Sequence, residues 1–187
     1  MKIPLLLLFF SASPLLAQDA DTVNARIELA RVLTYDKKFD EAAKTFREVL
    51  AQDPQNVAAL KGLGQALFWG GKPKESLEVA EKISAAQRDA ETNVLLGDLF
   101  VIAKNLPDAE TAFTAYLAEN PDDAAVRVRL ADVQSWRKEY PKALENFEIV
   151  LKQLPEDKQV RRKYGTVLSW AGRYEDAARE LKAGLDQ

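Results

Sequence analysis

The chain has 187 residues, with 26 Lys plus Arg against 29 Asp plus Glu, so its formal net charge is −3. It contains neither cysteine nor histidine, which excludes zinc sites built from those residues, thiol nucleophiles, Ser-His-Asp triads and disulfides. A mildly acidic chain also lacks the basic surface expected of a nucleic-acid binder, so we expect no nucleic-acid partner.

The first seventeen residues have the pattern of a secretory signal peptide. Lys2 supplies the positive end, an apolar run follows, and Ala17 ends a stretch of small and apolar residues just before Gln18 and Asp19. We predict a signal peptide over residues 1–17 and a short lead over residues 18–22. The apolar run is shorter than the roughly 18 to 20 residues that span a bilayer, so an uncleaved anchor is the weaker alternative. No glycosylation sequon occurs, which favours a bacterial periplasm over a eukaryotic exterior.

The rest of the chain is built from internal repeats. Trp69 and Trp136 are 67 residues apart, which equals 33 plus 34, and Trp170 follows 34 residues later. The same register divides the chain into repeats at residues 23–56, 57–89, 90–123, 124–157 and 158–187. A period of this length is typical of helical repeat proteins.

Two sets of positions define the repeat. The eighth residue is always small: Ala30, Gly64, Gly97, Ala131 and Gly165. The twenty-fourth residue is mostly a large apolar one: Phe46, Ala80, Phe113, Phe147 and Leu181. Large and small residues in a helical spacing predict two helices per repeat that pack closely against each other.

Prolines and polar residues separate the helices. Pro73, Pro107 and Pro141 follow the turn within a repeat, where a missing N–H at a helix start costs nothing. Asp53 and Asn120 precede prolines between repeats, and we expect both to act as N-caps.

This pattern resembles the tetratricopeptide repeat over the whole chain after the lead. The resemblance implies an all-α, right-handed superhelix, an α-solenoid, of about five helix-turn-helix repeats. Repeat two departs most, since Ala80 replaces the aromatic and Arg88 stands where other repeats have proline; we expect its second helix to pack more loosely. We expect the fifth repeat to lack the solvating helix that usually closes such arrays.

The resemblance also implies a concave groove lined by the first helix of each repeat. Its thirteenth position is aromatic in four of five repeats, which could form a ladder for a partner's side chains. The alternative is that these rings only fill space before the turn. The candidate partner-binding residues are Tyr35, Lys61, Gln65, Phe68, Trp69, Asp98, Asp132, Trp136, Arg162 and Trp170.

The charges of this groove are mixed, which favours a partner with alternating charge and argues against a polyanion. Related adaptors hold a partner's terminal carboxylate in a clamp of Lys, Asn and Arg. Only Lys61 matches that clamp, and Gln65 stands where Asn is expected, so we do not predict this activity.

Candidate catalytic groups are lacking. Adjacent carboxylates such as Asp122 and Asp123 do not face each other on a helix, and the glycines near Lys72 do not match a phosphate-binding loop. We predict no enzyme activity, no cofactor and no metal.

Three functional hypotheses follow. The first is a periplasmic scaffold that binds a protein or peptide of the cell envelope in its groove. The second is an accessory factor for exopolysaccharide export or glycan binding, because the stretch from Leu168 to Tyr174 looks like the repeats of bacterial polysaccharide exporters. The third is self-association through the uncapped last repeat.

Overall fold

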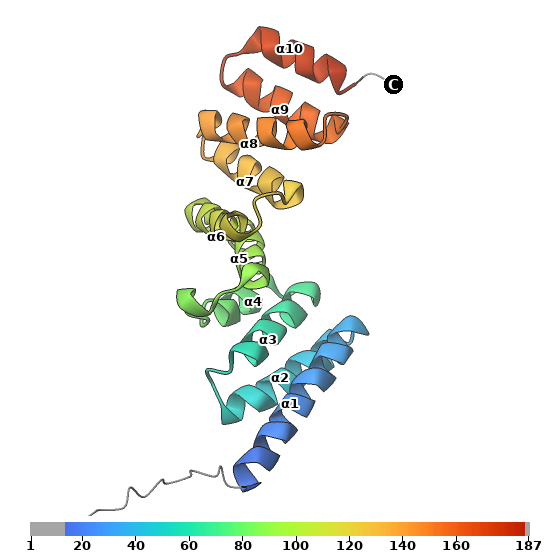
Figure 1. Ribbon diagram of the computed structural model, residues 1–187, viewed down its shortest axis with the longest axis vertical. Coiled ribbons are helices and arrows are strands. Elements are labelled where there is room, and N and C mark those ends of the chain that lie inside the picture. Colours follow the sequence, from blue (N-terminus) through green and yellow to red (C-terminus); the bar gives the residue numbers. More distant parts are fainter. Residues whose placement is uncertain (1–13, 186–187) are drawn as a thin grey trace, which may run out of the picture.

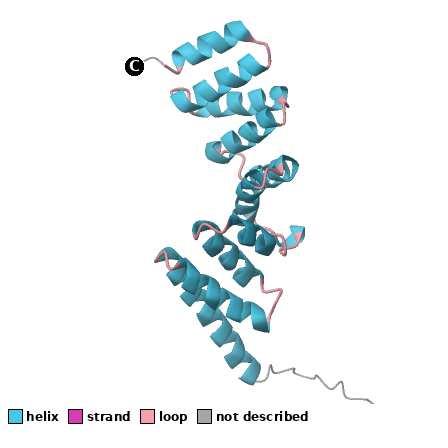
Figure 2. Ribbon diagram, turned by 180° about the vertical axis from the view of Figure 1, so that it is seen from behind, coloured by secondary structure: helices cyan, strands magenta, loops and turns pink. Residues whose placement is uncertain are grey.

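The helices follow one another in chain order along the long axis of the molecule, from α1 at one end to α10 at the other (Figure 1). The structure is a computed structural model that describes residues 14–185, and the regular structure of this part is entirely helical (Figure 2). The helices are α1 (Pro14–Tyr35), α2 (Phe39–Gln52), α3 (Val57–Trp69), α4 (Pro73–Ala80), α5 (Ala90–Ile102), α6 (Leu106–Glu119), α7 (Ala124–Trp136), α8 (Tyr140–Gln153), α9 (Lys158–Trp170) and α10 (Tyr174–Ala183), with a 3-10 turn, η1 (Ala85–Gln87), between α4 and α5. The expected solenoid of paired helices is therefore confirmed.

The turn inside each repeat depends on one left-handed residue. The fifteenth position has a positive φ in all five repeats, between 60° and 79°. It is occupied by Lys37, Gly71, Lys104, Lys138 and Gly172. The next residue donates its N–H to a carbonyl five positions back, as Lys38 does to Leu33 at 2.9 Å, which closes the first helix and reverses the chain.

Close packing within the repeat confirms the predicted pairing of small and large residues. The ring of Phe113 is fully buried, and it lies so near Gly97 that a Cβ there would come within 2.4 Å of a ring carbon. The equivalent phenylalanines, Phe46 and Phe147, are also fully buried. In repeat three the neighbouring helix thus requires a glycine at the eighth position.

The expectation that Asp53 and Asn120 act as N-caps was wrong. Both are C-caps, of α2 and α6 respectively, because the residue before a proline is pushed out of the helical conformation. The N-cap falls just before each following helix. There the side chains of Asn56, Asp89, Asp123 and Asp157 accept a hydrogen bond from the backbone N–H three residues on.

Repeat two departs from the others in its second helix. The helix α4 has 8 residues and ends at Ala80, whereas α2, α6 and α8 each have 14. The segment that would form its last turns runs instead through η1. The substitution of alanine for the large residue removes a side chain that would hold those turns against the first helix.

The first helix is longer than the repeat requires. It begins at Pro14, so the predicted lead over residues 18–22 is continuous with α1. Residues 1–13, which make up most of the predicted signal peptide, lie outside the described residues. Among residues 14–185, no helix has both the length and the apolar composition needed to cross a bilayer.

Candidate functional site: a groove over the first three repeats

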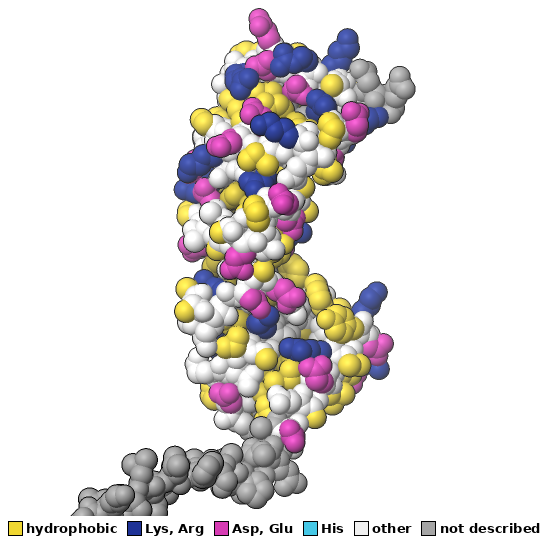
Figure 3. Space-filling view, in the orientation of Figure 1, with side chains coloured by type: hydrophobic (Ala, Val, Ile, Leu, Met, Phe, Trp, Pro, Cys, Tyr) yellow, Lys and Arg dark blue, Asp and Glu magenta, His cyan; other side chains and the backbone are white. Residues whose placement is uncertain are grey.

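A groove lies along the first helices of repeats one to three, where the side of the stack is hollowed (Figure 3). Its volume is about 450 Å³. It is lined by Tyr35 of α1, by Gln65, Phe68 and Trp69 of α3, by Ala90, Glu91, Val94, Leu95 and Asp98 of α5, and by Tyr116 of α6 and its C-cap Asn120. The structure thus brings together five of the ten predicted residues.

A second hollow of about 280 Å³ adjoins the groove between α1 and α3. It shares the side chains of Tyr35, Gln65, Trp69 and Glu91 with the groove, and it adds Lys61. The two hollows therefore form one continuous surface over repeats one to three.

Aromatic side chains form the accessible apolar part of this surface. Trp69, the last residue of α3, is 49% exposed, and Tyr35 at the end of α1 is 78% exposed. Phe68 is half-buried against the core of repeats two and three. These large residues present apolar area without a covering element, as in a peptide-binding groove.

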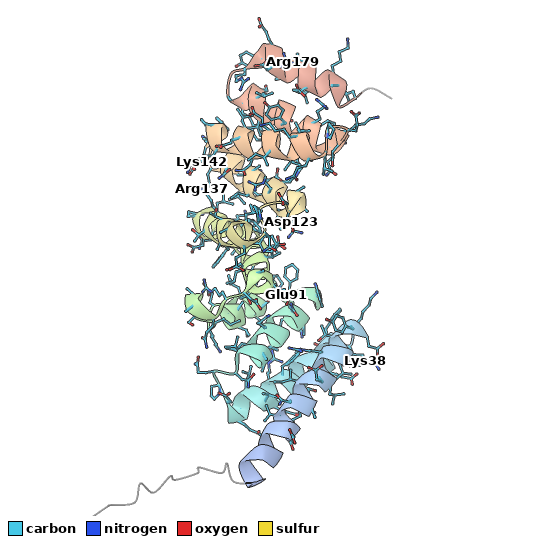
Figure 4. The ribbon with its side chains drawn as sticks, viewed as in Figure 1. Lys38, Glu91, Asp123, Arg137, Lys142 and Arg179 are labelled. Atoms are coloured by element: carbon cyan, nitrogen blue, oxygen red, sulfur yellow. The ribbon has the colours of Figure 1, made fainter. Side chains whose placement is uncertain are left out.

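The charged residues near the groove are already paired. The ammonium of Lys61 contacts the carboxylates of Asp89 and Glu91, and Glu91 extends from the start of α5 (Figure 4). Asp98 accepts a hydrogen bond from Arg129 of the next repeat at 2.8 Å. The mixed charge predicted for the groove therefore exists, but internal ion pairs satisfy much of it.

The other predicted residues lie beyond this groove. Asp132 pairs with Lys163, again between neighbouring repeats. Arg162 donates to the carbonyl of Gly184 at 2.9 Å and so holds the end of α10. Neither they nor Trp136 and Trp170 line the groove of repeats one to three.

Burial affects the two acidic residues of the inter-repeat pairs. It raises the pKa of the Asp98 carboxyl above its ordinary value, although Arg129 acts in the opposite direction. The pKa of Asp132 is raised for the same reason, and Lys163 opposes this shift. These carboxylates are partly withdrawn from water, which fits a role in joining repeats.

The thirteenth position has a similar exposure in repeats two to five, whereas Tyr35 in repeat one is 78% exposed. Trp69, Trp136 and Trp170 are 49%, 51% and 52% exposed, and Ile102 is 53% exposed. Repeats two to five thus share this half-exposed setting, whether tryptophan or isoleucine occupies the position. What distinguishes Trp69 is its place in the groove beside Phe68.

The sequence analysis did not predict that residues of α6 and its C-cap would line the groove. Tyr116 and Asn120 line the groove, although they belong to the second helix of repeat three and to its C-cap. Tyr116 occupies a position where three other repeats have valine or isoleucine, and its hydroxyl donates to Asp123 at 2.7 Å. The presence of tyrosine at a position that is aliphatic in three other repeats is the feature of the sequence that could have indicated this role.

The last repeat leaves apolar side chains exposed. Tyr174 at the start of α10 is 71% exposed, and Leu185, just after this helix, is 74% exposed. Self-association through this repeat stays a prediction. Within residues 14–185, no three acidic side chains lie close enough together to hold a metal ion.

Comparisons with known proteins agree with the helical repeat. Sequence profiles described as tetratricopeptide repeat match residues 33–96, 93–134 and 137–187. Cellulose synthase operon protein C of Pseudomonas fluorescens (strain SBW25) is 32% identical over 108 residues. This match covers 53% of the chain but only 8% of that much longer protein.

Solved structures show the same fold. YrrB, described as a TPR protein with an unusual peptide-binding site, superposes with a TM-score of 0.84 at 19% identity, over 92% of this chain and 90% of its own. MamA superposes with a TM-score of 0.81 at 23% identity, over 89% and 91% of the two chains. At these identities the likeness concerns the fold alone, and together with the matching profiles it shows that the chain belongs to the tetratricopeptide repeat family.

Proposed function

We propose that the protein is a non-catalytic periplasmic scaffold that binds a protein or peptide segment in the groove over repeats one to three. The observation that carries this proposal is the continuous surface in which Tyr35, Phe68 and Trp69 present apolar area that no described element covers. The peptide-binding site described for YrrB is compatible with it. The predicted signal peptide supports the periplasmic location in this proposal.

Apolar contacts should dominate recognition in this groove. Lys61 and Asp98 are both engaged by partners in the chain, so a ligand would have to displace these contacts before it could use the charges. A ligand can contact the exposed aromatic rings without first displacing an ion pair. Aromatic anchors also contribute a large share of the binding energy at protein interfaces. We therefore expect the bound segment to insert at least one apolar or aromatic side chain between Phe68 and Val94.

Photo-crosslinking in the native cell envelope tests the proposal. A photo-reactive residue replaces Trp69 in one sample and Glu78 in another, because Glu78 is exposed on α4 and does not line the groove. Capture of the same envelope protein from position 69 alone supports the proposal. Capture of nothing, or equal capture from both positions, contradicts it.

A matched pair of variants then measures the groove's contribution. Once the captured segment is known, Trp69→Ala should weaken its binding by about 30-fold, the effect of a buried aromatic anchor. Trp170→Ala removes an equally exposed ring outside the groove, and it should leave the affinity within about twofold of wild type. Equal losses from both variants would favour the aromatic ladder instead.

A second candidate function is a role in exopolysaccharide export or glycan binding. The similarity to cellulose synthase operon protein C favours it, and sugar rings stack on exposed tryptophan. The test is titration of the protein with cellulose oligosaccharides while its tryptophan fluorescence is recorded. Saturable quenching that Trp69→Ala abolishes would support this candidate, and no change would count against direct glycan binding.

A further inference from the structure

A third hollow lies between η1, α5 and α6 and shares no residue with the groove. Its volume is about 300 Å³. Phe100 and Ala112 contribute apolar surface, and Asn93, Arg88 and Glu119 contribute polar groups. The question is why a hollow of this size opens in repeat three.

The equivalent place in repeats four and five is occupied by a guanidinium group. The fourth residue of repeat four, Arg127, donates to Asn146 of α8 at 2.9 Å and to the carbonyl of Pro121 at 2.6 Å. Arg161 of repeat five repeats this arrangement with Glu180 at 2.8 Å and the carbonyl of Pro155 at 2.6 Å. The same side-chain chemistry thus connects the first helix, the second helix and the preceding loop in both repeats.

Repeat three has short residues at both of the equivalent positions. Asn93 stands where Arg127 and Arg161 stand, and Ala112 replaces their partners Asn146 and Glu180. Both residues line the hollow. The hollow is therefore the space that an arginine side chain fills in the next two repeats.

The lining retains groups that can receive a guanidinium. Asn93 is only 7% exposed, and its side-chain amide has no hydrogen-bond partner among the described residues, although the amide atoms themselves are not fully buried. Glu119 and Asp108 add two negative charges against the one positive charge of Arg88, so the lining is net negative by one. The Nε of Arg88 donates to the carbonyl of Ile83 at 3.0 Å, which leaves the amide of Asn93 to an incoming group.

We propose that this hollow binds a guanidinium group supplied from outside the chain. The flat cation would donate hydrogen bonds to the amide oxygen of Asn93 and to the carboxylate of Glu119, and its faces would lie against Phe100 and Ala112. It would place beside Asn93 a guanidinium like those of Arg127 and Arg161 in repeats four and five, in addition to Arg88, which already lines the hollow. This site does not depend on the groove or on its proposed ligand.

Two sources can provide the group: free arginine, or an arginine side chain of a partner protein. NMR titrations of the full chain with L-arginine and with the capped tripeptide Ala-Arg-Ala distinguish them. Saturable shifts of the Asn93 side-chain amide and of Thr111 and Ala115 are expected. Binding of the tripeptide at least as tight as that of arginine identifies a partner's side chain, and tighter binding of free arginine identifies the small molecule.

Variants that fill the hollow provide the decisive test. Asn93→Arg supplies the missing guanidinium from within, and it should raise the melting temperature and weaken binding of either probe by at least about tenfold. Gln159→Arg adds the same charge at an exposed position of α9 and should leave binding unchanged. Two results would overturn the proposal: unsaturable shifts with both probes, or preferential binding of a capped glutamate peptide.

Discussion

At the scale of single residues, the left-handed position in the turn of each repeat has a measurable cost. Lys104 has a φ of 60°, a conformation that is unfavourable for residues with a Cβ by about 1 kcal/mol or more. Lys104→Gly should therefore raise the free energy of unfolding by about 1 kcal/mol. Denaturant unfolding of the two proteins measures the difference.

The opposite substitution serves as the control. Gly71 has a φ of 74° and no atom within 4 Å of the place where a Cβ would stand. Gly71→Lys should thus lower the free energy of unfolding by a similar amount through backbone conformation alone. If both substitutions destabilise, the side chain of Lys104 contributes more than its backbone costs, and the argument fails.

At the scale of the helices, the close approach of α5 and α6 limits what the eighth position can hold. Gly97→Ala would place a methyl group 2.4 Å from the ring of Phe113, and overpacking of this kind typically costs about 1–3 kcal/mol. Phe113→Leu in the same chain should recover part of this loss, because it removes the clashing ring edge. The coupling between the two substitutions in a double-mutant cycle tests the contact, and strict additivity would contradict it.

The N-cap of α5 should make stability depend on pH in the acid range. Burial acts against the charged form of Asp89, but hydrogen bonds from Lys61 and from the side chain and backbone of Thr92 outweigh it and lower the pKa from 3.8 to about 2. A carboxyl with a lowered pKa in the folded state stabilises the fold above its ordinary pKa. That stabilisation is lost as the pH falls from 3.8 to about 2.

Since the Asp89 side chain is half exposed, we expect this contribution to be about 1 kcal/mol after screening by solvent. Asp89→Asn keeps a capping side chain but removes the charge, so its unfolding free energy should change less than that of wild type over this range. Lys61→Gln should show part of the same effect, whereas Lys74→Gln, an exposed lysine of α4, should show none. An unchanged acid profile for Asp89→Asn would refute the assignment.

At the scale of the whole molecule, the repeat frame could be predicted from sequence because it rests on local rules. The spacing of the tryptophans and the pairing of positions such as Gly97 and Phe113 recur in each repeat, so the helices and their order follow. The groove was harder to predict, because Tyr116 and Asn120 line it from a second helix and its C-cap. The internal partners of Asp98 and Arg162 were also missed, because Arg129 and Gly184 lie in other helices or turns, and such pairs depend on how neighbouring helices stack.

Stability should be distributed unevenly along the stack. In a solenoid each repeat contacts only its neighbours, and α4 has 8 residues where the other internal second helices have 14. Ala80 ends this helix without a large side chain, and Ile83 is the one large side chain that residues 81–88 bury. Fewer apolar contacts mean a lower free energy of local opening.

Amide hydrogen exchange can resolve this difference. We expect α4 and residues 81–88 to exchange with an opening free energy about 1–2 kcal/mol below that of α6, with limited proteolysis beginning in the same segment. The helix α6 is the appropriate comparison, because it packs on the far side of the same first helix, α5. Equal protection of α4 and α6 would mean that the array unfolds as one cooperative unit. In that case the short helix would not weaken the stack at repeat two, and the groove that spans α3 and α5 would be as rigid as the repeats beyond it.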